Sequence, residues 1–165
     1  MNKFLFVLFT VLIGVFIQVF FNHYFSFWGS GPQILLLLTI VLGFLAGPLL
    51  AEIVGFVLGM FSDAMGGTLF GQHMFLLCLA GFMAGMLQKR VASERPAAQI
   101  VIAFFGTCYF SLGTWFIDKF FESGILRIAW TPFFVSMIFN LALVTVIFRI
   151  TEYWLHFWRI QPDIN

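Results

Sequence analysis

Two carboxylates stand out in a chain where acidic side chains are rare. Glu52 and Asp63 belong to one apolar segment, and as a helix it places Glu52, Gly55, Gly59 and Asp63 within an arc of about 80°. A carboxylate in hydrocarbon costs several kcal/mol, so this stripe should face a protein interior or a water-filled cavity. The two carboxylates would lie roughly 16 Å apart along the helix, which is too far for one acid–base pair.

Each acidic residue has two possible roles. Glu52 could relay protons or contact a substrate, or its carboxylate could lie near a helix N-terminus, where the helix dipole favours negative charge. Asp63 could cap a helix or end a turn. His73 follows it closely in sequence, so we expect either an Asp63–His73 contact across the turn or a histidine that meets lipid headgroups or water.

Motifs for catalysis are absent from the sequence. It has no G-x-S-x-G, no H-E-x-x-H, no glycine-rich phosphate loop and no His/Cys cluster with ligand spacing. Cys78 and Cys108 lie inside apolar runs, which is typical of small buried hydrophobic residues. We therefore expect no catalytic residue, no metal and no cofactor.

The amino-acid composition indicates that most of the chain lies in a lipid bilayer rather than in water. Of 165 residues, 62% are hydrophobic and 9% are charged, with a net charge of +1, whereas soluble domains carry about 25% charged residues. A net charge this low does not fit nucleic-acid binding, which depends on neutralising phosphates. The chain is predicted to be an all-α integral membrane protein embedded in the lipid bilayer.

Charged and turn-forming residues divide the chain into six helices. The long stretch 33–62 is split at Gly47-Pro48, because proline removes a backbone donor and disfavours helix in the residue before it. The predicted helices form a single transmembrane domain over residues 1–165, and they span 4–21, 33–46, 49–62, 72–87, 97–117 and 132–155.

The basic residues predict the orientation, because Lys and Arg accumulate on the cytoplasmic side. With six spans, only Lys119 and Arg127 lie outside. If 33–62 were a single span, the cluster at 89–95 would be outside, against the rule. We therefore expect a six-transmembrane-helix bundle with both termini cytoplasmic, and with these residues inside: Lys3, Lys89, Arg90, Arg95, Arg149 and Arg159.

Small residues and aromatic residues suggest two kinds of contact. Three G-F-x-x-G pentapeptides, Gly43–Gly47, Gly55–Gly59 and Gly81–Gly85, offer surfaces for close helix packing. The outer loops are rich in apolar side chains, which fit an interfacial aromatic belt or a docking surface for a partner. These candidate partner-binding residues are Tyr24, Phe25, Phe27, Trp28, Phe120, Phe121, Ile125, Leu126 and Trp130.

The last helix becomes amphipathic beyond Phe148. One side carries Arg149, Glu152, His156 and Arg159, while Tyr153, Trp154, Phe157 and Trp158 supply aromatic side chains for the membrane interface. This segment is either a simple interfacial anchor or a docking face for a cytoplasmic partner.

A block between Pro32 and Gly85 resembles the MreD family of bacterial rod shape-determining membrane proteins. Pro32 precedes a leucine-rich run, Ile34–Leu38, and a Gly-Pro break follows at Gly47-Pro48. Beyond it comes a spaced set of glycines with one aspartate and two apolar residues, which also carries the resemblance: Gly55, Phe56, Gly59, Asp63, Gly67, Leu69 and Gly71.

The resemblance implies a non-enzymatic subunit of the cell-elongation machinery in the bacterial inner membrane. Its partners would be an MreC-like membrane protein, the MreB filament, and the glycosyltransferase and transpeptidase that build lateral peptidoglycan. The family is also similar in fold to S-components of energy-coupling-factor transporters, so the alternative is a substrate-binding subunit of a vitamin transporter. S-components typically carry an A-x-x-x-A face on the first helix, and residues 1–21 contain no alanine.

Overall fold

The computed structural model describes residues 3–24, 31–66, 69–88, 96–121 and 130–160, and all regular structure in them is helical. The six helices confirm the predicted number. Their bounds are α1 Lys3–Tyr24, α2 Ile34–Ala46, α3 Pro48–Gly66, α4 Gln72–Leu87, α5 Pro96–Phe121 and α6 Trp130–Phe157.

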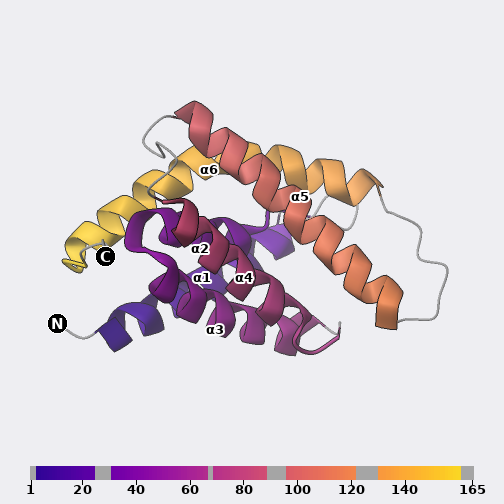
Figure 1. Ribbon diagram of the computed structural model, residues 1–165, viewed down its shortest axis with the longest axis horizontal. Coiled ribbons are helices and arrows are strands. Elements are labelled where there is room, and N and C mark those ends of the chain that lie inside the picture. Colours follow the sequence, from indigo (N-terminus) through magenta and orange to yellow (C-terminus); the bar gives the residue numbers. More distant parts are fainter. Residues whose placement is uncertain (1–2, 25–30, 67–68, 89–95, 122–129, 161–165) are drawn as a thin grey trace.

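Successive helices run in opposite directions. The Nε1 of Trp154 near the end of α6 donates to Thr10 near the start of α1, and Gly85 at the end of α4 lies against Pro48 at the start of α3. Gln72 at the start of α4 donates to Asp118 near the end of α5, so these neighbouring helices are antiparallel as well. Figure 1 shows α5 and α6 together on one side of a cluster formed by α1 to α4.

Helix α2 lies at the centre of this cluster. Eleven of its 13 residues are buried, and it packs against every other helix. At 1.5 Å per residue it is roughly 20 Å long, which is shorter than a bilayer core of about 30 Å. Its neighbours shield it, so most of its surface meets protein rather than lipid.

The break between α2 and α3 occurs at the predicted dipeptide. Gly47 has φ +98°, a left-handed conformation that glycine adopts without steric cost. Its N–H donates to the carbonyl of Gly43 at 3.2 Å, which closes the last turn of α2. Pro48 is the first residue of α3, where its missing N–H is not needed.

The long helices present apolar side chains outward. Four helices, α1, α3, α5 and α6, are long and apolar enough to cross a membrane. Phe16, Phe105 and Ile138 are each more than 60% exposed in the middle of their helices. Exposure of such apolar surfaces to water is unfavourable, whereas their exposure to lipid is not. These faces are therefore suited to contact with the bilayer.

Four helices extend beyond their predicted ends: α1 reaches Tyr24 and α3 reaches Gly66, whereas the sequence suggested 21 and 62, and α5 and α6 are longer as well. Helix α5 continues to Phe121 and α6 begins at Trp130, whereas the sequence suggested 117 and 132. The predicted ends of α5 and α6 were placed at charged or proline residues. Lys119 remains helical and lies 4.8 Å from the centre of the Trp115 ring, so a favourable cation–π contact accompanies the extra turn.

Candidate functional site

Glycines bring the backbones of α3 and α4 into direct contact. A Cβ atom at Gly55 would lie 2.7 Å from the carbonyl oxygen of Leu77, and one at Gly81 would lie 2.7 Å from that of Ala51. A Cβ at Gly59 would collide with the backbone of Met74. A residue with a side chain would not fit at these three positions. The spacing of the glycines predicted this close packing of helices.

The same packing extends to α2 and to the end of α4. A Cβ at Gly43 would lie 2.7 Å from the Cβ of Ala84, and one at Gly85 would meet Pro48. Phe56, by contrast, is 45% exposed and points away from this contact. Phe56 therefore belongs to the outer surface of α3, although it lies next to Gly55 in the resemblance pattern.

Asp63 caps helix α4 from the neighbouring helix. Its Oδ2 accepts hydrogen bonds from the backbone N–H groups of Gly71 at 2.9 Å and Met74 at 3.0 Å, and its Oδ1 accepts from that of His73 at 2.9 Å. The first residues of a helix have N–H groups without intrahelical partners. The predicted capping role of Asp63 is confirmed, and it explains why a carboxylate only 4% exposed is tolerated.

The cap comes from another helix because the N-cap residue of α4 is a glycine. Gly71 occupies the N-cap position with φ +100° and has no side chain to offer. Most N-caps use the side chain of Ser, Thr, Asp or Asn at that position. Here the left-handed backbone favours glycine, and Asp63 supplies the missing acceptor.

His73 completes this cluster. Its Nδ1 lies 2.8 Å from Oδ1 of Asp63, so the predicted Asp63–His73 contact is confirmed. A carboxylate can only accept, which assigns the proton to Nδ1. The ring also lies 5.5 Å from that of Phe110, so the contact ties α3 and α4 to α5.

Glu52 has a different environment from Asp63. It is partly exposed and lies in the second turn of α3, one turn later than the macrodipole effect is strongest. The Sγ of Cys78 donates to its Oε1 at 3.8 Å, a long and weak contact. Glu52 and Asp63 are thus not brought together, as their helical separation predicted.

Uncharged polar residues form a second cluster that sequence reasoning missed. The Oδ1 of Asn140 accepts from the backbone N–H of Gln33 at 2.9 Å, and its Nδ2 donates to Thr107 at 2.9 Å. The Oε1 of Gln18 accepts from the N–H of Leu35 at 3.2 Å. Four helices therefore meet at the start of α2, and an Asn or Gln inside an apolar helix was the signal for it.

Two polar cavities open beside this cluster, at the end of the bundle where α2 and α4 begin. They have volumes of about 210 Å³ and 410 Å³. Gln18, Asn22 and Ser62 line both of them. Gln33 and His73 line the smaller cavity, and His23 lines the larger one. Most of these side chains can both donate and accept hydrogen bonds.

The described part of the outer aromatic set is exposed. Tyr24, Phe120, Phe121 and Trp130 are each between 60% and 75% exposed, and they lie at the end of α1, the end of α5 and the start of α6. The other proposed contact residues, and one glycine of the resemblance pattern, lie outside the described residues: Phe25, Phe27, Trp28, Ile125, Leu126 and Gly67.

The final turns of α6 present one polar face and one packed face. Arg149, Glu152, His156 and Arg159 are exposed, and this exposure is compatible with docking. Two of the four nearby aromatic residues that the sequence suggested for the interface also pack against another helix. Trp154 donates to Thr10 at 3.0 Å, and the Trp158 ring lies 6.2 Å from that of Phe6, because α1 packs here.

The parts of the chain that the structure describes contain no group of three or more His, Cys, Asp or Glu residues that could hold a metal ion. Cys78 and Cys108 are both free thiols. The clusters described above therefore organise helix ends by hydrogen bonds.

We compared the chain with models of known protein families. A model of the rod shape-determining protein MreD matches residues 1–158. The chain belongs to the MreD family. Membership extends the resemblance seen between Pro32 and Gly85 to nearly the whole chain, so α5 and α6 are part of the MreD architecture as well. No curated protein and no solved structure matches the chain.

MreD membership carries a broad statement of function. It implies a role in determining rod cell shape and an association with the elongation machinery, and the family is generally non-catalytic. It also agrees with a helical membrane protein that has four candidate transmembrane helices.

Proposed function

We propose that this protein is a non-catalytic scaffold of the elongation machinery in the inner membrane, and that it acts by contacts with an MreC-like membrane protein. The match of the MreD family model to residues 1–158 carries this proposal. The closely packed α3 and α4 would hold the bundle in one shape. Its surface would then present binding sites to the MreB filament and to the enzymes that build lateral peptidoglycan.

The exposed aromatic residues at the outer end support one contact surface. Tyr24, Phe120, Phe121 and Trp130 come from three helices. Aromatic residues are enriched at the centres of protein interfaces, where they contribute much of the binding energy. We assign this surface to the MreC-like partner, and the exposed face from Arg149 to Arg159 to a cytoplasmic partner.

The experiment is co-purification from a rod-shaped bacterium whose own MreD is replaced by this protein. Phe120→Ala/Phe121→Ala should lower recovery of the MreC-like partner at least tenfold and round the cells. Phe16→Ala/Phe82→Ala is the matched control, since it removes two exposed rings from helix middles. Equal recovery with both variants would contradict the assignment of the surface, and failure of the unaltered protein to maintain rods would contradict the function.

The polar cavities favour a second candidate, the binding of a small polar substrate as in a transporter subunit. Their volumes of about 210 Å³ and 410 Å³ are near the lower end of the range of about 300–1,000 Å³ for small-molecule sites. Recovery of a transporter ATPase in the same purification, in place of shape-determining proteins, would favour this candidate. The first candidate is preferred because the family match covers nearly the whole chain.

A further inference from the structure

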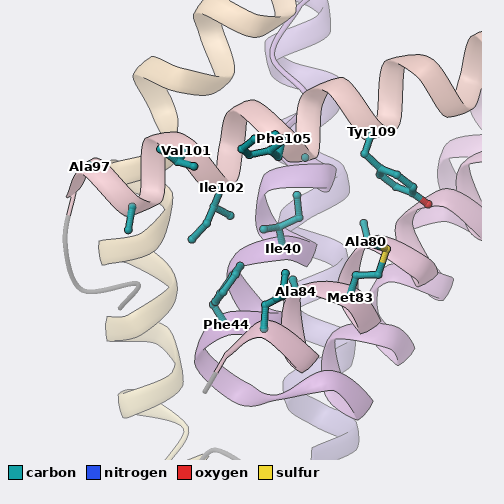
Figure 2. A pocket seen from close by; sticks show the side chains of 13 residues that line it. Ile40, Phe44, Ala80, Met83, Ala84, Ala97, Val101, Ile102, Phe105 and Tyr109 are labelled. Carbon is teal, nitrogen blue, oxygen red and sulfur yellow. The ribbon is translucent and has the colours of Figure 1, made fainter. Parts of the chain in front are cut away.

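The cavities of the bundle differ in the chemistry of their walls. Figure 2 shows a groove of about 490 Å³ between α2, α4 and α5, with apolar side chains such as Ile40, Phe44 and Ala84 in its wall. Of its described lining residues, only Tyr109 has a polar side-chain group, and that hydroxyl donates to the carbonyl of Leu76 at 3.3 Å. By contrast, amide, hydroxyl and imidazole groups line the smaller polar cavity, at the start of α2 and α4. The smaller polar cavity is therefore the better place for a hydrogen-bonding ligand.

Part of this polar wall is engaged by the fold itself. The amide of Gln18 donates to Asn22 at 2.8 Å and to the carbonyl of Pro32 at 3.0 Å, and its Oε1 accepts from the N–H of Leu35 at 3.2 Å. Gln18 thus uses both amide hydrogens and its oxygen within the protein. It shapes the wall and leaves ligand binding to its neighbours.

Three donor groups in the same wall have no acceptor among the described residues. The side-chain oxygen of Asn22 accepts from Gln18, and that of Gln33 accepts from Asn140 at 3.4 Å. Their NH₂ groups donate to no acceptor in the parts of the chain that the structure describes, and the hydroxyl of Ser62 has no hydrogen-bond partner there. Asn22, Gln33 and Ser62 all line the smaller cavity, so these groups are available to a molecule inside it.

His73 supplies an acceptor in this wall. Its Nδ1 donates to Oδ1 of Asp63 at 2.8 Å, which leaves Nε2 of the neutral ring as an acceptor. The side chain is 21% exposed and lines the smaller cavity. The carboxylate that caps α4 therefore also fixes the tautomer of a residue in the cavity wall.

The wall favours an uncharged ligand with several hydroxyl groups. No Lys, Arg, Asp or Glu is among the described residues that line either polar cavity, so an ionic ligand would lose its hydration without gaining a counter-charge. One hydroxyl group can donate to Nε2 of His73 while it accepts from a side-chain amide. The ring of Phe110 lies in the same wall and offers an apolar surface to C–H groups. Saccharide rings combine hydroxyl groups with such C–H groups.

We propose that the smaller polar cavity binds one ring of a neutral saccharide. Asn22, Gln33 and Ser62 donate to its oxygen atoms, and His73 accepts from one of its hydroxyl groups. The larger cavity shares Asn22 and Ser62 with the smaller one, so a second sugar ring can extend into it. The inference rests on neither candidate function given above, because a scaffold and a transporter subunit can both hold a ligand.

Saturation-transfer difference NMR of the full chain in phosphatidylcholine nanodiscs tests this proposal, with glucose as the probe. Nanodiscs replace maltoside detergents, whose sugar headgroups would compete. Ser62→Leu, which fills the wall shared by both cavities, should raise the Kd of glucose at least about tenfold. Ser111→Leu is the matched control, at another partly buried serine that lines neither polar cavity. Equal Kd values for the two variants, or no saturation transfer to glucose in wild type, would overturn the site.

The charge of the sugar tests the ligand class. Protonated glucosamine and glucuronate have the same ring as glucose and should each bind at least about fivefold more weakly, because the wall offers them no counter-charge. Equal binding of either one would overturn the selection of a neutral ligand.

A smaller substitution separates lost binding from lost fold. Ser62→Ala removes the hydroxyl without filling the cavity and should raise the Kd of glucose about threefold to tenfold. Its thermal unfolding midpoint should equal that of wild type, since no described group depends on this hydroxyl. An unchanged Kd for Ser62→Ala would overturn the role of Ser62 as a ligand donor.

Discussion

The pair α3 and α4 is joined backbone to backbone, whereas α5 meets its neighbours through side chains. Gly55, Gly59 and Gly81 leave no room for a methyl group between α3 and α4. At Gly106 and Gly113 of α5, an added Cβ would meet only the tips of Ile40 and Leu76. Four of the 26 residues in α5 are buried. One molecule thus combines two helices in direct backbone contact with a third, α5, whose glycines meet only flexible side chains.

The largest expected effect is a methyl group at the tightest contact. Gly59→Ala should destabilise the protein by about 3 kcal/mol or more, because the new Cβ collides with the backbone of Met74, which cannot rotate away as a side chain can. Thermal unfolding in detergent micelles, together with the yield of monodisperse protein, measures this.

Gly113→Ala is the matched control on α5. Its Cβ would lie 2.5 Å from Cδ2 of Leu76, a flexible atom, and alanine gains about 1 kcal/mol in helix propensity. We expect a change smaller than about 1 kcal/mol. Equal losses from the two substitutions would show that the two helix pairs do not differ in rigidity.

A smaller effect is expected from removal of the cap on α4. Asp63→Ala should cost about 2–3 kcal/mol, since it leaves three backbone N–H groups and the His73 ring without their acceptor. Asp63→Asn should be nearly as damaging, because its NH₂ group would face donors. The free energy of unfolding in detergent, from chemical denaturation, measures both.

Asp118→Ala removes the corresponding carboxylate from α5. The hydrogen bond from Gln72 to Asp118 is lost, and the carbonyl of Thr114 still accepts from Gln72. The expected cost is about 1 kcal/mol or less. A cost equal to that of Asp63→Ala would contradict the idea that one acidic residue organises a helix end and the other only joins two helices.

A smaller effect again is expected from loss of Asn140, which joins α6 to α5 and to the start of α2. Asn140→Ala should cost about 1–2 kcal/mol, because the N–H of Gln33 loses its acceptor, while the hydroxyl of Thr107 loses one donor and still donates to the carbonyl of Ala103. Ser136→Ala, which removes one hydrogen bond to the carbonyl of Gly31, should cost less than half as much. A lower unfolding midpoint for Ser136→Ala than for Asn140→Ala would contradict this ranking.

The sequence allowed the prediction of features that depend on local chemistry. Gly47-Pro48 marked a helix break because proline lacks an N–H, and the spacing of Gly55, Gly59 and Asp63 placed them on one face. A capping role was one of the two alternatives for Asp63, although the helix that it caps, α4, was not predicted. These predictions rest on contacts within one helix or across one turn.

Features that depend on distant partners could not be predicted. Asn140 and Gln33 are 107 residues apart, and single polar residues in apolar helices produce no periodic pattern. The packing of Trp154 and Trp158 against α1 was not predicted either, because nothing local indicates that α1 contacts them. The inward or outward direction of an aromatic residue in a membrane protein depends on the neighbouring helix.

The start of α2 has a consequence for how this protein is made. Its first N–H groups are satisfied by Gln18 from α1 and by Asn140 from α6. The second helix to leave the ribosome therefore waits for the sixth before all its backbone donors are paired. The hydrogen bonds at the start of α2 are therefore completed only near the end of synthesis.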